Sequence, residues 1–243
     1  MTGASNGASQ RFFRGGVKMA ELAKYENFVD RVNELGFMPM SNLLEGLPSL
    51  TGETPKEIWH TGDRETDPWC WKDRAAEEKK LAFGCILGGH KGFIAPHMYA
   101  AFYNAFRPEE HMEERHEAGM ISPVVWELWK LFETRTLLDT SDIRREMGVT
   151  QKKGGSKVDS AIKELQKKFY ITVAGNRRKT DKFGEPYGWP ANVYDKIENW
   201  VPGEWMKISG KLCPGAAKEI ILERGAVIGN NINAKTLAKT LGF

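Results

Sequence analysis

The sequence predicts an α+β protein that is mostly helical, and three observations support this class. Apolar residues recur at helical spacing in several segments that Gly and Pro separate. Segments rich in β-branched and aromatic residues flank turns at 81–95 and 169–189, which predicts two antiparallel hairpins. Of the 243 residues, 41% are hydrophobic and 28% are charged, as in globular proteins. We therefore expect a winged helix-turn-helix domain beside a helical N-terminal lobe that contains one β-hairpin.

The N-terminal lobe is predicted to span residues 19–119 and to begin with a helix. Residues 1–18 are mostly small or polar, which predicts a disordered tail. The helix from Ala20 to Leu35 follows, because Tyr25, Phe28 and Val32 share one face and Gly36 ends it. Residues 41–50 are expected to form a short helix and a turn.

A tryptophan-rich loop at residues 59–71 has two interpretations. Asp67 followed by Pro68 is typical of the N-cap and first turn of a helix, here predicted to run from Trp69 to Lys79. The same loop makes Asp67, His60 and Asp63 candidate catalytic residues, since a carboxyl buried among aromatic rings has a raised pKa and can act as an acid or a base. The residue pattern leaves both interpretations open.

The rest of the lobe is expected to be structural. Segments 81–87 and 92–95 predict a hairpin around Gly88 and Gly89, and Pro96 begins another helix. The histidines lack metal-ligand spacing, so neither a metal site nor a cofactor is predicted. The three cysteines form no Cys-x-x-Cys pair and no apolar run is long enough to cross a bilayer, so we expect a cytoplasmic protein without a membrane partner.

Residues 120–206 carry the order of elements that is typical of a winged helix. Ser122 and Pro123 begin a helix, and Thr140 or Ser141 begins a short second one. A third helix is predicted at 155–169, followed by a strand at 169–174, a basic turn at 175–185 and a returning strand at 187–189.

Basic side chains collect on the exposed face of the third helix and on the hairpin tip, where a winged helix meets DNA. The net charge of +3 is mild, so the argument depends on where the charge lies. We predict that the protein binds double-stranded DNA mainly through phosphates. The candidate nucleic-acid-binding residues are Lys157, Ser160, Lys163, Lys167, Arg177, Arg178, Lys179 and Lys182.

The chain beyond the predicted wing is expected to be helical. Residues 192–200 predict a short helix, and Pro214 begins a longer one. The last helix, near residues 231–242, looks like the second helix of a truncated helix-turn-helix. Residues 207–243 are therefore predicted to be C-terminal helices that pack on the protein or form a homodimer contact.

Several of these features together resemble the bacterial crosslink-repair (alkylpurine) DNA glycosylases, which are built of tandem winged helices, and their smaller relatives. The resembling features are the Asp67-Pro68-Trp69-x-Trp71 loop, the segment Leu-Gln-Lys-Lys-Phe169 that connects the third helix to the strand, the segment from Trp189 to Trp200 that follows the hairpin tip, and the C-terminal segment from Lys218 to Gly242. The resemblance implies the winged-helix fold and a role in DNA repair. Those enzymes hold a catalytic water with a Gln-hydrophobic-Gln or Gln-hydrophobic-Asp motif, and Gln10, Gln151 and Gln166 do not form one.

Three functions follow from the sequence. The first is a DNA-binding winged-helix protein without chemistry. The alternative is a glycosylase-like enzyme that acts on alkylated or crosslinked bases through the loop carboxylates. A second alternative is a winged helix that contacts another protein, because that fold is not restricted to DNA.

Overall fold

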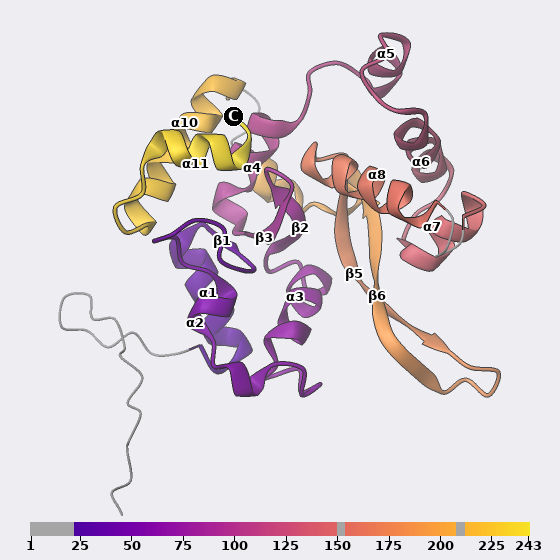
Figure 1. The fold of residues 1–243 in the computed structure, drawn as a ribbon, viewed down its shortest axis with the longest axis horizontal. Helices are drawn as coiled ribbons and strands as arrows, with labels where there is room; N and C mark the ends of the chain where they lie inside the picture. Colours follow the sequence, from indigo (N-terminus) through magenta and orange to yellow (C-terminus); the bar gives the residue numbers. More distant parts are fainter. Residues whose placement is uncertain (1–21, 150–153, 208–211) are drawn as a thin grey trace, which may run out of the picture.

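The structure is a computed structural model that describes residues 22–149, 154–207 and 212–243. Helices surround two three-stranded antiparallel sheets (Figure 1), which confirms the predicted mostly helical α+β class. The tail predicted at residues 1–18 lies outside the described residues. No helix in the described ranges is long and apolar enough to cross a membrane.

The first sheet lies in the N-terminal part of the chain and has the strand order β1-β3-β2. The predicted hairpin is confirmed as β2 and β3, but the sequence did not predict β1, which is only three residues long. Residues 41–49 form turns rather than the expected short helix. The elements are α1 (Tyr25–Leu35), β1 (Phe37–Pro39), α2 (Leu50–Glu53), a 3-10 turn (Lys56–Ile58), α3 (Pro68–Glu77), β2 (Ala82–Leu87), β3 (His90–Ile94) and α4 (Pro96–Phe106).

The second sheet follows and has the strand order β4-β6-β5. The three helices predicted between residues 122 and 169 are present. The strands of the following hairpin are longer than the predicted 169–174 and 187–189. The helix predicted at 192–200 is wrong for residues 192–196, because Val193 and Tyr194 pair with β4 and β5 instead. The elements are α5 (Met112–Glu117), α6 (Pro123–Thr134), β4 (Leu138–Asp139), α7 (Thr140–Glu146), α8 (Gly155–Lys167), β5 (Ile171–Thr180), β6 (Pro186–Lys196) and α9 (Ile197–Trp200).

The C-terminal helices α10 (Pro214–Ile228) and α11 (Ala234–Leu241) pack back on the N-terminal part of the chain, after a 3-10 turn at Gly203–Met206. α10 lies against α4, and Arg224 donates hydrogen bonds from α10 to the carbonyls of Glu34 and Leu35 at the end of α1. α11 lies against α10 and reaches the β2–β3 turn at Gly88. In this structure the predicted C-terminal helices thus contact their own chain.

One continuous apolar core joins the parts of the chain on either side of residue 119. Phe169, which is fully buried, contacts Tyr99 and Phe106 of α4 with ring centroids 5.7 Å and 6.2 Å away. Trp200 donates a hydrogen bond to the carbonyl of Ala76 in α3 at 3.2 Å. These contacts fix the second sheet against the first.

Substitution of Gly88 tests how tightly α11 closes on the hairpin. A Cβ at Gly88 would lie 2.1 Å from the carbonyl oxygen of Leu241, and the φ of +62° disfavours any side chain. We expect Gly88→Ala to lower the free energy of unfolding, measured by urea denaturation, by about 2 kcal/mol more than Gly119→Ala. Gly119 is the matched control because it has a φ of +67° and a Cβ added there would have no atom within 4 Å. Equal losses in the two variants would contradict the close packing of α11.

Candidate nucleic-acid interface

The hairpin of β5 and β6 carries half of the predicted DNA-binding residues, namely Arg177, Arg178, Lys179 and Lys182. At the inner end of the hairpin, strand β6 forms hydrogen bonds with β4. The outer half of the hairpin extends away from the body of the protein (Figure 1). The register between the two strands shifts between Arg177 and Lys179. Arg177 and Arg178 consequently have different surroundings, although they are adjacent in the sequence.

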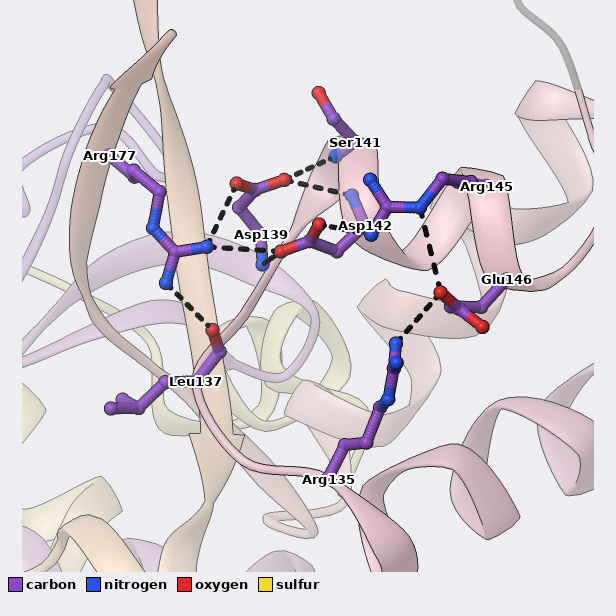
Figure 2. Close-up of polar contacts among 8 residues, drawn as sticks. All are labelled: Arg135, Leu137, Asp139, Ser141, Asp142, Arg145, Glu146 and Arg177. Carbon is purple, nitrogen blue, oxygen red and sulfur yellow. Dashed lines mark hydrogen bonds and ion pairs between the residues drawn. The ribbon is translucent and has the colours of Figure 1, made fainter. Parts of the chain in front are cut away.

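Arg177 contacts the start of α7 (Figure 2). Its guanidinium Nη1 lies 3.3 Å from Asp139 Oδ2 and 3.0 Å from Asp142 Oδ2, and Nη2 donates to the carbonyl of Leu137 at 3.1 Å. The carboxylates of Asp139 and Asp142 thus both pair with the positive charge of Arg177. Arg177 fastens the hairpin to α7.

The two carboxylates are fixed in place because they also cap α7. Asp139 accepts hydrogen bonds from the backbone N–H groups of Ser141 and Asp142 at 2.7 Å and 2.9 Å, so Asp139 is the N-cap in place of the expected Thr140 or Ser141. Arg145 pairs with Asp142 at 2.7 Å on the outer side (Figure 2). Burial raises the pKa of the Asp142 carboxyl, but the hydrogen bond from Arg145 and the charges of Arg145 and Arg177 outweigh burial and hold this pKa below its ordinary value.

Arg178 borders a different site, a cleft between the hairpin and the tryptophan-rich loop. The cleft has a volume of about 500 Å³, and we call it the tryptophan cleft. Among the described residues Arg178 forms no ion pair, whereas Arg64 pairs with Glu77 and Arg74 pairs with Glu65 and Glu78. The residues that line the tryptophan cleft are His60, Thr61, Gly62, Arg64, Asp67, Trp69, Cys70, Asp73, Arg74, Asn176, Arg178, Trp189 and Pro190.

Three aromatic rings meet in the tryptophan cleft. The ring centroids of His60 and Trp69 are 5.2 Å apart, those of His60 and Trp189 5.9 Å, and those of Trp69 and Trp189 6.4 Å. Trp189 is nearly perpendicular to both neighbours and stays 70% exposed. The exposed Trp189 and Arg178, which forms no ion pair among the described residues, therefore line the same cleft.

The three candidate catalytic residues have different environments. Asp67 is 1% exposed and accepts hydrogen bonds from the backbone N–H groups of His60, Gly62 and Trp69 at 3.0, 2.9 and 2.8 Å. This confirms Asp67 as the N-cap of α3. Asp63 is exposed, and the hydrogen bond from the Glu65 N–H lowers the pKa of its carboxyl, the opposite of what a general acid needs. His60 is exposed at the mouth of the cleft, and a catalytic role for all three stays a prediction.

Helix α8, which carries the other four predicted residues, lies near the base of the hairpin, away from the tip (Figure 1). A Cβ built on Gly89 would lie 3.3 Å from Lys163 Cε and 3.4 Å from Lys167 Cδ, so both lysines run along the β2–β3 turn. Lys157 and Ser160 are exposed on the same helix. The structure therefore separates the predicted DNA-binding residues into two groups: Lys157, Ser160, Lys163 and Lys167 on α8, and Arg177, Arg178, Lys179 and Lys182 on the hairpin.

The sequence did not predict that the tryptophan-rich loop and the hairpin share a cleft. Trp189, Asn176, Arg64 and Arg74 all line it, and none was a candidate site residue. No local pattern connects segments that are more than 100 residues apart. The one local signal was the position of Trp189 between Gly188 and Pro190, two residue types that are common in turns and loops.

Comparison with known proteins gives one finding. The family model described as "AlkZ related" matches residues 22–242, which is nearly the whole chain. No curated protein and no solved structure matched the sequence.

The capping role of Asp67 can be tested by unfolding. We expect Asp67→Ala to lower the free energy of unfolding by about 2 kcal/mol, because three backbone N–H groups lose their acceptor. Asp67→Asn keeps one carbonyl oxygen and should cost less. Asp63→Ala, at an exposed position in the same loop, should stay within about 0.5 kcal/mol of the unaltered protein. Similar losses in Asp67→Ala and Asp63→Ala would argue against the cap.

The Asp142 carboxylate predicts a pH dependence of stability. Its folded-state pKa lies below the ordinary 3.8, so its stabilising effect is complete above that pH and is lost as the pH falls toward the folded value. Asp142→Asn should therefore lower the free energy of unfolding by about 1 kcal/mol at pH 7, with a smaller difference at pH 3. Urea denaturation at both pH values measures this. Glu127→Gln, on the exposed side of α6, should show no such difference, and an Asp142→Asn loss that grows toward low pH would contradict the prediction.

Proposed function

The chain belongs to the AlkZ-related family, and on that premise we propose that it binds duplex DNA, mainly through phosphates, in DNA repair. The observation that carries the proposal is the outer half of the β5–β6 hairpin. Arg178, Lys179 and Lys182 are all exposed there and, in the described part of the chain, form no ion pair. Unpaired cations on a projecting hairpin are suited to phosphate contacts.

We also infer that residues 120–206 form a winged helix. The order α6, β4, α7, α8, β5 and β6 supports this, as does the pairing of β4 with the hairpin. In this proposal residues 19–119 form the N-terminal lobe and residues 207–243 the C-terminal helices. The hairpin is then the wing, and α8 is the third helix.

The two groups of basic residues contribute differently in this proposal. Arg177 positions the hairpin, because its guanidinium already faces two carboxylates. Arg178, Lys179 and Lys182 contact phosphates. Lys157, Ser160, Lys163 and Lys167 form a second phosphate contact at α8, and lysines and serines there favour positioning over base reading.

The alternative function is base excision, and the family relation is the observation that favours it. In that case DNA bound by the hairpin would present an alkylated or crosslinked base to the loop that contains His60, Asp63 and Asp67. Release of a modified base from such DNA separates this function from binding alone. Binding that does not respond to salt would instead favour contact with another protein.

Salt dependence of duplex binding tests the proposed function. Each phosphate contact contributes roughly −0.9 to the slope of log K against log salt, so replacing Arg178, Lys179 and Lys182 by Ala should flatten that slope by about three. Affinity for all duplex sequences should fall alike. Fluorescence anisotropy with random duplex DNA at several salt concentrations measures both quantities.

The matched control removes the same charge elsewhere. Replacing Lys56, Lys235 and Lys239, which are exposed lysines outside both basic groups, by Ala should leave the slope nearly unchanged. If the two triple variants lose the same affinity, total charge and not the hairpin governs binding, and the proposed contact surface is wrong.

A further inference from the structure

We propose that the tryptophan cleft binds one unpaired nucleotide of DNA, with its base stacked on Trp189 and its phosphate against Arg178. This inference rests on the proposed DNA binding. It specifies which part of the bound DNA enters the cleft beside the hairpin. It does not require any bond to be broken.

The tryptophan cleft adjoins the basic part of the hairpin. Asn176, Arg178, Trp189 and Pro190 line the cleft, and Lys179 and Lys182 follow immediately along the chain toward the tip. A strand whose phosphates contact Lys179 and Lys182 therefore passes beside the cleft mouth. The volume of about 500 Å³ is in the range of sites that hold a small organic ligand.

The aromatic rings of the tryptophan cleft leave Trp189 accessible. Trp69 and His60 contact Trp189 with interplanar angles of 80° and 82°, and Trp189 stays 70% exposed. An exposed ring that two neighbouring rings contact offers a stacking platform for a nucleobase, and such stacking is tolerant of base identity.

The charged and hydrogen-bonding groups of the tryptophan cleft suit a phosphate and the edge of a base. Asp67 accepts hydrogen bonds from three backbone N–H groups, and Asp73 forms an ion pair with Lys72. The negative charge of each carboxylate is therefore offset, and its repulsion of a phosphate is weakened. Arg178 is the cation of the cleft that lacks a carboxylate partner among the described residues. The side-chain amide of Asn176 also makes no hydrogen bond there, and an amide can both donate to and accept from a base edge.

The nucleotide must be unpaired because of how a duplex covers its bases. A paired base is stacked on both faces and has no free face for Trp189, whereas an unpaired base leaves the stack at low cost. Removing one aromatic platform in such sites typically costs roughly 1–3 kcal/mol per base, which corresponds to about a 5- to 150-fold change in affinity.

The experiment compares three duplexes that share one flanking sequence. The first is fully paired, the second has a single unpaired thymidine, and the third has an abasic nucleotide at the same unpaired position. The abasic duplex has the same local flexibility but offers no base to stack. We expect the protein to bind the unpaired thymidine about tenfold more tightly than either of the other two, measured by fluorescence anisotropy.

Two variants connect this preference to the cleft. Trp189→Ala should reduce the ratio of the affinities for unpaired and paired DNA to near one. Tyr187→Ala is the matched control, because Tyr187 is an exposed aromatic residue on the same strand that does not line the cleft, and it should keep the ratio. Circular dichroism verifies that both variants are folded.

The outcomes separate this inference from the proposed function. Equal affinity for paired and unpaired DNA, an equal preference for the abasic duplex, or a ratio that persists in Trp189→Ala would overturn the cleft as a nucleotide site. In each of those cases salt-dependent duplex binding would still support the hairpin. Absence of binding to all three duplexes would overturn both proposals.

Discussion

The attachment of the β5–β6 hairpin between α3 and α7 is the constraint on which the rest of the structure depends. On one side Arg177 faces the two carboxylates that begin α7. On the other side β5 comes so close to α3 that a Cβ on Gly175 would lie 2.8 Å from Glu77 Cγ. The hairpin can project its tip from the body because both faces of its base are held.

This attachment gives adjacent residues of the same charge different roles. The guanidinium of Arg177 is neutralised by Asp139 and Asp142, while that of Arg178 has no carboxylate partner among the described residues. Counting basic residues along the sequence treats the two as equivalent. The ion pairs of Arg177 with residues distant in the sequence determine which cations of the hairpin are available to a phosphate, because a cation already paired with carboxylates attracts a phosphate weakly.

Gln166, one of the three glutamines that do not form the catalytic motif of the crosslink-repair glycosylases, has a structural role here. Gln166 is buried in α8, accepts a hydrogen bond from the backbone N–H of Cys85 at 3.0 Å and donates one to the carbonyl of Ile162 at 3.3 Å. Gln166 joins α8 to strand β2, and Gly84 leaves the room that the Gln166 amide fills. Membership of the AlkZ-related family thus accompanies a chain in which this glutamine stabilises the junction between the two sheets.

The sequence by itself determined the elements whose signals are local. Three helices begin at N-cap residues, because the side chain of an N-cap accepts a hydrogen bond from a backbone N–H two or three residues later. These N-caps are Asp67, followed by Pro68, Ser122, followed by Pro123, and Asn233. The apolar stripe of α8 likewise follows from spacing alone. Tertiary structure decided the strand at 192–196, the pairing of Arg177 and the tryptophan cleft. In each case the partner is distant in the chain, as Trp69 is from Trp189, and the local pattern of either segment has no information about which distant segment will lie against it.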